Sequence, residues 1–365
     1  MRRSLCRGSR RLLKATVAAA LHWSGTAPAL RALLGSNGPL VVGYHRVVED
    51  FDVAARHALP SMLISRAMLE RQLDWIGRRY RVVSLGELGR ELERGEVRGR
   101  PAAAITFDDG YRDVYDHAFP LLARMGMPAA VFVVTDLVGT TELQTHDRLH
   151  ASISRALMRW GASIGPLERH LLRLGIRPER CRTITAGDAE AVTRRLLRSL
   201  SRPHLRSVLA FLEAEAGRDE ERTPRALPLT WEMVREMHRA GMTIGSHTRS
   251  HALLTNESPG SRSDEIDGSR RELEAGLGAP VAHFAYPDGR FNRAAVRAVA
   301  AAGFRFGYTT CRHRDAIYPQ LTIPRCLLWE RSSIDATGGF SPAIMSCQSL
   351  GLMTGRPSCT QWAHG

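Results

Sequence analysis

Two short polar motifs, each close to the end of an apolar run typical of a strand, constrain the fold of this chain most. The first is Thr106-Phe107-Asp108-Asp109-Gly110, which follows Ala102–Ile105, and the second is His247-Thr248-Arg249-Ser250-His251, which follows Met242–Gly245. A third strand-like run, Ala129–Thr135, lies between them. This β-α-β rhythm is typical of a parallel α/β fold, in which ligand groups gather at the carboxyl ends of the strands.

The two motifs together contain the groups of a metal site. Two adjacent carboxylates and two histidines four residues apart supply three ligands for a divalent ion and leave one carboxylate as a base. The turn at Gly110 lets the two carboxylates approach one point from different directions, and we expect a helical turn to bring both imidazoles to one side. Each motif alone is more often a solvated turn or a surface accident, but their joint occurrence after strands favours the metal site.

These residues resemble the polysaccharide deacetylase family, also called the NodB-homology domain or carbohydrate esterase family 4. The family's first motif is TFDDG followed by an aromatic residue or proline, here Tyr111, and its second is H-[ST]-x-x-H. The resemblance covers roughly residues 38–330, and Phe284–Gly289 is similar to the third motif. It implies that Asp109, His247 and His251 bind a metal ion, usually zinc, that Asp108 is the general base, and that the backbone amide of Tyr111 stabilises the oxyanion.

The acid that protonates the leaving amine has no counterpart at the family's usual place. The C-terminal run Leu321–Trp329 contains no histidine, whereas the apolar run Leu40–Tyr44 ends in His45. This arrangement resembles a permuted branch of the family, typified by poly-N-acetylglucosamine deacetylases, and implies that His45 is the acid. The alternative is a histidine that only hydrogen-bonds a neighbour at a strand end.

The third motif departs from the family pattern. Ala285 and Asp288 stand where many relatives have an arginine, which orients the catalytic aspartate, and a tyrosine. Arg325 is our candidate to orient Asp108 instead, and an ordinary surface charge is an equally good interpretation of Arg325.

The predicted fold is therefore α/β, a distorted (β/α) barrel of the NodB type with about seven strands. Residues 37–330 form this domain, with a helical insertion at about 140–227 that either lines the substrate cleft or covers only its own apolar face. Residues 331–365, rich in Ser, Gly, Thr and Pro, predict an irregular or disordered tail. The expected strands are Leu40–Tyr44, Ala102–Phe107, Ala129–Thr135, Thr243–Gly245, His283–Tyr286, Phe306–Thr309 and Thr322–Leu328.

The basic charge of the chain is uneven. The formal net charge is +14, but the only lysine is Lys14, and this one-sided use of arginine indicates a codon bias rather than a nucleic-acid partner. Residues 1–36 form a basic segment whose apolar stretch is too short to span a bilayer, so we predict that residues 1–34 make a peripheral membrane contact.

Six cysteines without regular spacing indicate free thiols. A cytoplasmic or peripherally membrane-associated protein is favoured over a secreted one.

The predicted function is metal-dependent hydrolysis of an acyl group, above all N-acetyl, from an amino sugar of a polysaccharide, glycan or glycolipid. Two alternatives remain at this stage. The first is hydrolysis of another C–N bond or of an O-acetyl ester on the same fold. The second is a non-catalytic protein that binds membranes or polyanions.

Overall fold

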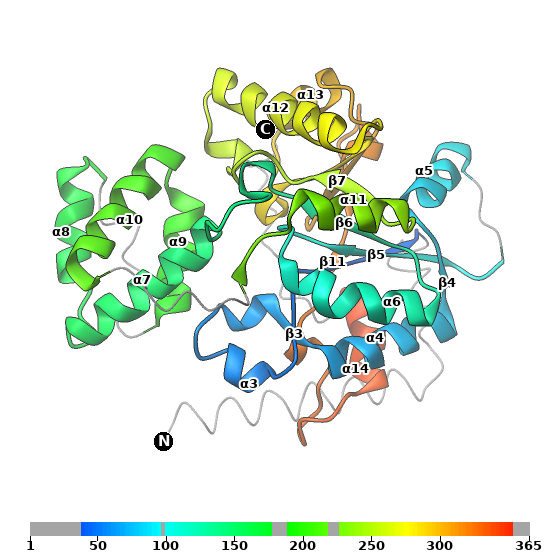
Figure 1. The fold of residues 1–365 in the computed structure, drawn as a ribbon, viewed down its shortest axis with the longest axis horizontal. Coiled ribbons are helices and arrows are strands. Elements are labelled where there is room, and N and C mark those ends of the chain that lie inside the picture. The colour runs from blue at the N-terminus through cyan, green and yellow to red at the C-terminus, as the bar shows by residue number, and fades with distance from the viewer. Residues whose placement is uncertain (1–37, 96–98, 177–187, 218–225, 353–365) are drawn as a thin grey trace.

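A closed sheet of parallel strands forms the centre of the molecule in a computed structural model that describes residues 38–95, 99–176, 188–217 and 226–352 (Figure 1). The strands follow the order β10-β9-β8-β7-β6-β5-β1-β11. Only Arg325 separates β10 from β11, so the same stretch pairs with β9 on one side and with β1 on the other. The expected barrel is confirmed, with the strands β1 (Leu40–Tyr44), β5 (Ala102–Phe107), β6 (Ala129–Val133), β7 (Thr243–Ser246), β8 (His283–Ala285), β9 (Phe306–Thr309), β10 (Ile323–Pro324) and β11 (Cys326–Leu327).

Helices cover the outside of this sheet, and small elements extend it. The strand β4 (Arg81–Val82) adds to β5, and β2 (Arg46–Val48) pairs with β3 (Leu63–Ser65) in a separate sheet. The helices beside the barrel are α3 (Phe51–Ala54), α4 (Arg66–Arg79), α5 (Leu85–Arg94), α6 (Phe119–Met125), α11 (Trp231–Arg239), α12 (Pro259–Leu277) and α13 (Arg293–Ala301).

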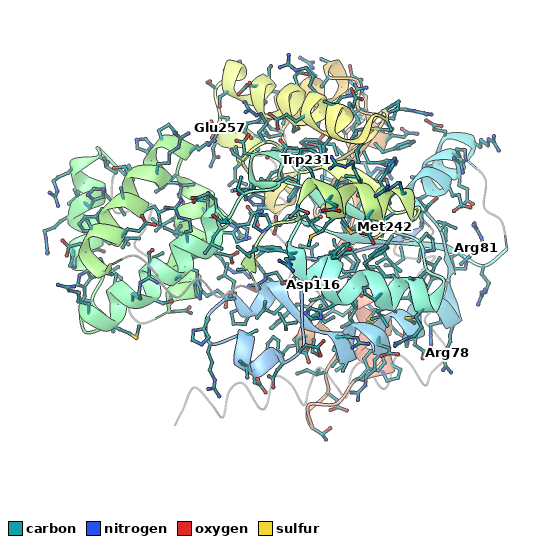
Figure 2. All side chains as sticks on the ribbon, in the orientation of Figure 1. Arg78, Arg81, Asp116, Trp231, Met242 and Glu257 are labelled. Atoms are coloured by element: carbon teal, nitrogen blue, oxygen red, sulfur yellow. The ribbon has the colours of Figure 1, made fainter. Side chains whose placement is uncertain are left out.

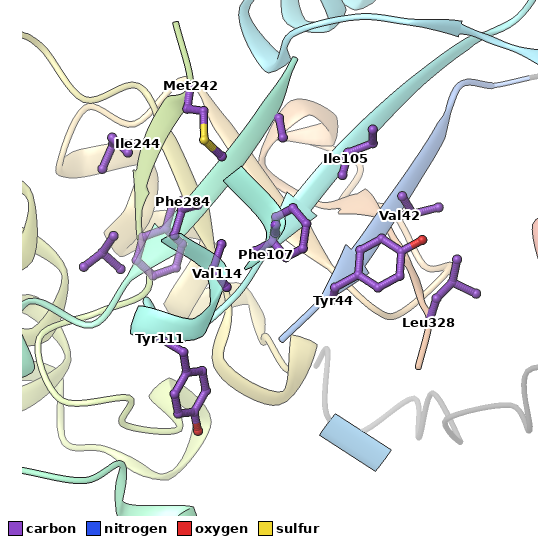
Figure 3. Packing of buried hydrophobic residues seen from close by; sticks show 14 of the residues in the cluster. Val42, Tyr44, Ile105, Phe107, Tyr111, Val114, Met242, Ile244, Phe284 and Leu328 are labelled. Carbon is purple, nitrogen blue, oxygen red and sulfur yellow. The ribbon is translucent and has the colours of Figure 1, made fainter. Parts of the chain in front are cut away.

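Alternate residues of the strands supply two different cores. Val42, Ile105 and Phe107 belong to the cluster between the sheet and the helices, part of which is shown in Figure 3. The other face of the strands fills the barrel, where the rings of Phe132 and Tyr308 lie 5.3 Å apart although β6 and β9 are not neighbours. This alternation follows from the period of two along a strand and explains why the strands are apolar throughout.

Four helices form the insertion, which lies to one side of the barrel (Figure 1). They bury leucines, isoleucine and valines in a core of their own. Pro203 lies in the first turn of the fourth helix, where a proline costs no hydrogen bond. The helices are α7 (Thr145–Arg159), α8 (Gly165–Arg173), α9 (Ala189–Ser199) and α10 (Arg202–Ala216).

The prediction of an irregular tail after residue 330 is wrong for its first part. Residues 342–349 form the helix α14 (Pro342–Ser349), which Ser341 caps by accepting from the amide of Ile344. Met345 is fully buried in the main core, and the hydroxyl of Ser333 accepts a hydrogen bond from Gln72 of α4 at 2.9 Å. The buried residues of α14, together with Ile334 and Phe340, which also pack on the main core, attach a segment whose composition is otherwise typical of a loop.

Other predictions concern the chain ends and the cysteines. The basic segment 1–36 and residues 353–365 lie outside the described residues. None of the helices that the structure describes is long and apolar enough to cross a bilayer. Cys311, Cys326 and Cys347 carry free thiols, as expected, and the other three cysteines lie outside the described ranges.

Candidate active site

The two aspartates of the first motif leave β5 in different directions because the backbone changes hand between them. Asp108 continues the strand direction, and its amide donates to the carbonyl of Tyr44 at 2.8 Å. Asp109 and Gly110 are both left-handed, with φ of 74° and 68°. The expected turn is confirmed, and it begins one residue earlier than the glycine. Asp109 therefore occupies a conformation that a non-glycine residue seldom adopts, which is typical of functional sites.

The second motif reaches the same place by a turn that is not helical, so the expected helical turn is wrong. Thr248 and His251 are left-handed, with φ of 67° and 58°. The amide of Asp136, just after β6, donates to the carbonyl of Arg249 at 2.8 Å and holds the turn from outside. The left-handed backbone at Thr248 and at His251, rather than one turn of helix, places the imidazoles of His247 and His251 side by side, with ring centroids 4.9 Å apart.

Asp109, His247 and His251 form a cluster suited to a metal ion. One ligand atom from each lies within 4.8 Å of the others, and Oδ1 of Asp109 lies 3.5 Å from Nε2 of His247 and 3.3 Å from Nε2 of His251. Both carboxylate oxygens of Asp109 are buried and accept no hydrogen bond from any described residue. Burial, together with the nearby charges of Asp108 and Asp147, raises the pKa of Asp109 well above its usual range. A bound cation would satisfy these oxygens and keep the carboxylate ionised.

The third motif orients His247 through its backbone. Nδ1 of His247 lies 2.8 Å from the carbonyl oxygen of Ala285, an acceptor, so Nδ1 carries the proton. The lone pair of Nε2 therefore faces Asp109 and is available to an ion. Replacement of the family's arginine by Ala285 leaves this contact intact, because the contact uses the main chain.

Arg325 orients Asp108. Its Nη1 and Nη2 donate to the two oxygens of Asp108 at 2.6 and 2.7 Å, and Nη1 also donates to the hydroxyl of Thr106 at 3.0 Å. Burial pushes the pKa of Asp108 upward, but the charge and hydrogen bonds of Arg325, together with the neighbouring imidazole of His247, outweigh burial and lower the pKa to about 2. Arg325 is only 6% exposed, so the interpretation as a surface charge is wrong.

His45 follows β1 and interacts electrostatically with Asp108 and Arg325. It is partly exposed, unlike Asp108 and His247. Loss of hydration lowers the pKa of His45 to about 4, and the carboxylate of Asp108 acts in the opposite direction. The histidine is thus neutral in the resting site, and a negative charge beside it favours its protonated form.

Tyr111 contacts two different parts of the chain, Pro228 through its backbone and Asp147 through its hydroxyl. Its bridge to Pro228 uses the amide of Arg112 and the carbonyl of Gly110, which leaves the amide of Tyr111 out of that pairing. Its hydroxyl donates to Oδ2 of Asp147 at 2.6 Å. The predicted oxyanion donor is therefore not engaged in this bridge, while the side chain is anchored to the insertion.

The helical insertion supplies a site residue that the sequence interpretation missed, His146. It is 3% exposed, its Nε2 lies 3.8 Å from Oδ2 of Asp109, and its ring centroid lies 5.2 Å from that of His251. Nε2 also lies 2.7 Å from the hydroxyl of Tyr111. Since that hydroxyl gives its single proton to Asp147, Nε2 of His146 must be the donor in this contact. A His-Asp pair at the start of the first inserted helix was the available sequence signal.

Asp288, the other departure in the third motif, lies at the boundary with the insertion. It is left-handed, with φ of 52°, and its carboxylate accepts from Nε and Nη2 of Arg198 on α9 at 3.0 and 3.3 Å. It is partly exposed and binds the insertion rather than the cluster around Asp109.

A family model described as polysaccharide deacetylase matches residues 95–165 and 177–307, more than half of the chain. This chain belongs to the polysaccharide deacetylase family. The membership that the motifs suggested is confirmed, and the site described above lies within the matched part except for His45 and Arg325.

Similar proteins fit this family. YxkH of Bacillus subtilis is 21% identical over 251 residues, which are 68% of this chain and 60% of YxkH. The poly-beta-1,6-N-acetyl-D-glucosamine N-deacetylase of Staphylococcus epidermidis is 27% identical over 29% of this chain and 39% of that protein. The match thus spans less than two thirds of the length of each of these two relatives. The solved structure of IcaB from Ammonifex degensii shares the fold, with a TM-score of 0.51 at 18% identity over 86% of this chain and 97% of that one.

Proposed function

We propose that this protein is a metal-dependent hydrolase that removes N-acetyl groups from amino sugars of a polysaccharide of the poly-N-acetylglucosamine type. The observation that carries the proposal is that two adjacent carboxylates, those of Asp108 and Asp109, lie in different environments. Asp109 is buried beside two histidines, and its oxygens accept no hydrogen bond within the described part of the chain, whereas Asp108 is held ionised by Arg325. The substrate class follows from the names of the relatives, one of which is a poly-beta-1,6-N-acetyl-D-glucosamine N-deacetylase.

Asp109, His247 and His251 would hold the ion, for which zinc fits the two imidazoles and one carboxylate. When bound, the ion supplies a more acidic water molecule and polarisation of the acyl carbonyl. Asp108 accepts the proton of the water, because its carboxylate is ionised and fixed in direction by the two hydrogen bonds from Arg325.

The remaining steps need a donor to the oxyanion and a proton for the amine. The amide of Tyr111 is the candidate donor to the oxyanion, and a rigid N–H stabilises such a charge without reorganisation. Negative charge that develops beside His45 raises its pKa, which loss of hydration lowers, so the partly exposed imidazole takes up a proton from the solvent. His45 then gives this proton to the leaving nitrogen, and Asp108 returns the proton of the water to the solvent. Protonation is required because an unprotonated amine leaves poorly.

Measurements of bound metal and of acetate release test this proposal on the same variants. We expect purified protein to bind one divalent ion and to release acetate from N-acetylglucosamine oligomers. Asp109→Ala should lose both the ion and the activity. Asp108→Asn should keep the ion and lose roughly 100-fold or more of the rate, the usual contribution of a general base.

The outcomes separate the alternatives. Full activity in Asp108→Asn would refute the assigned base. A wild-type protein without stoichiometric metal would favour the non-catalytic alternative. Release of acetate only from O-acetylated substrates would replace the amide substrate with an ester on the same site.

A further inference from the structure

The turn that carries the two histidines rests on one buried carboxylate, that of Glu265 on α12. The amide of Ser250 donates to Oε2 of Glu265 at 2.9 Å, and the hydroxyl of Ser250 donates to Oε1 at 2.6 Å. The amide of Arg249 donates to the backbone carbonyl of Glu265 at 3.2 Å. The side chain of Glu265 is only 1% exposed. A single residue of α12 thus binds two consecutive residues of the turn between His247 and His251.

This support is needed because the turn cannot bond to itself as a helix would. The left-handed residues Thr248 and His251 break the helical pattern, so the polar groups of the turn need partners elsewhere. Its carbonyls accept from the amides of Thr135 and Asp136, at 3.3 and 2.8 Å. The amides of Arg249 and Ser250 donate to Glu265, and the amide of Thr248 donates to the hydroxyl of Ser246 at 3.2 Å. The position of His251 relative to His247 therefore depends on Glu265 from one side and on the end of β6 from the other.

The insertion supplies the cation that this carboxylate requires. Nη1 of Arg202, the first residue of α10, donates to Oε1 of Glu265 at 2.6 Å, and its Nη2 lies 3.7 Å from Oδ2 of Asp136. The amide of Arg202 also lies 3.4 Å from Oε1 of Glu257, which Figure 2 shows on the side of the barrel that faces the insertion. A buried carboxylate is strongly destabilising without a paired cation, so Glu265 needs Arg202. Since Glu265 also binds the turn, the packing of the insertion against the barrel and the conformation of the turn depend on each other.

We propose that Glu265 and Arg202 are a positioning pair through which the helical insertion fixes the metal-binding turn and raises the affinity for the ion. This inference rests on the proposed metal site. The salt bridge between Arg198 and Asp288 also joins the insertion to the barrel, but it touches no residue of the turn. Arg198 therefore provides a matched control for a tether that merely holds the insertion in place.

The test is a Zn²⁺ titration of the metal-free, full-length protein against a competing chelator, with the Co²⁺ absorption spectrum as a measure of ligand geometry. Glu265→Gln places an NH₂ group against donors in the turn, and we expect the dissociation constant to rise about 10- to 100-fold. Arg202→Met should raise it by about 10-fold and add little in the Glu265→Gln background, because the two residues act together. Arg198→Met should change it by about twofold at most.

The outcomes distinguish the inference from the proposed function. No ion bound by the wild-type protein would refute the metal site itself. A wild-type protein that binds Zn²⁺, with unchanged affinity in Glu265→Gln or with equal losses in Arg202→Met and Arg198→Met, would overturn the positioning pair alone. If metal-free Glu265→Gln fails to fold in a thermal unfolding control, Arg202→Met and Ser250→Ala decide, and both must weaken Zn²⁺ binding.

Discussion

At the scale of the residue, the cation that orients Asp108 comes from the strand that closes the barrel. Arg325 separates β10 from β11, and its amide donates to the carbonyl of Thr309 at 2.7 Å. Its guanidinium lies 5.3 Å from the centre of the ring of Phe132 inside the barrel. A planar guanidinium held this way presents two parallel donors to a carboxylate, which an ammonium group cannot do.

Arg325→Lys should therefore keep the charge and lose the alignment. We expect kcat for acetate release to fall about 100-fold, because small misplacement of a reacting group has effects of this size. The pKa of Asp108 should rise above about 2 in the variant, and the acidic limb of the pH–rate profile should move to higher pH, since only the ionised carboxylate accepts a proton. The control is Arg305→Lys, because Arg305 forms an exposed salt bridge with Glu93. This variant should leave kcat and the acidic limb of the pH–rate profile unchanged. An unshifted acidic limb in Arg325→Lys would contradict this role.

At the scale of the element, the first helix of the insertion is part of the active-site wall. Gln144, just before α7, donates to the backbone carbonyl of Asp109 at 2.9 Å. His146 and Asp147 in the first turn of α7 meet the hydroxyl of Tyr111. The insertion has its own core but also contacts Asp109, so the interpretation that it covers only its own apolar face is wrong. Its part in a substrate cleft stays a prediction.

Tyr111→Phe should reveal how strongly α7 is attached. Removal of the hydroxyl leaves buried polar groups of His146 and Asp147 without this partner, and we expect the free energy of unfolding to fall by about 1–3 kcal/mol. Tyr115→Phe is the control, because the hydroxyl of Tyr115 donates to Glu236 at the surface. Chemical denaturation measures both variants, and equal stabilities would show that the buried chain of hydrogen bonds contributes nothing.

The helix α14 provides a second test at this scale. Met345 is fully buried in the main core, whereas Met158 on α7 is 76% exposed. Met345→Ala should lower the free energy of unfolding by about 2–5 kcal/mol, and Met158→Ala by about 0.5 kcal/mol or less. A Met345→Ala protein as stable as the wild type would mean that α14 is not part of the cooperative fold.

At the scale of the whole molecule, closure of the barrel buries several histidines in their neutral form. His283 of β8 is one that lies apart from the metal cluster, with its ring stacked on Phe306 at 5.2 Å and Nδ1 3.1 Å from the hydroxyl of Tyr308. Burial, with a smaller contribution from Arg305, lowers the pKa of His283 to about 4. The unfolded chain binds a proton at about pH 6.5, so the folded state loses stability as the pH falls from there towards 4.

His283→Asn should weaken this acid sensitivity. We expect the free energy of unfolding to depend less steeply on pH between about 6.5 and 4, by at most about 1.4 kcal/mol per pH unit. Urea unfolding at several pH values measures the slope. His57→Asn, at an exposed position, should keep the slope of the wild type. The same slope in His283→Asn as in the wild type would contradict neutral burial of His283.

The sequence by itself determined the main strands of the barrel, the ends of strands at which polar residues gather, and the two motifs from which the metal ligands are proposed. These features are local, because apolar runs of strand length and complete short motifs do not depend on distant partners. The helical pattern of the insertion was visible for the same reason. The tail was predicted wrongly because its few apolar residues become significant only against the core that α14 covers.

Only the tertiary structure decided which distant groups meet. It showed that Arg325 forms a salt bridge with Asp108 and that His146 lies beside Asp109. It further showed that Glu265 binds the turn between the two histidines of the second motif. It also showed that changes of backbone hand, not a helical turn, bring the two histidines together. Contacts between strands and insertions far apart in the chain depend on how the sheet closes, and no local pattern records that geometry.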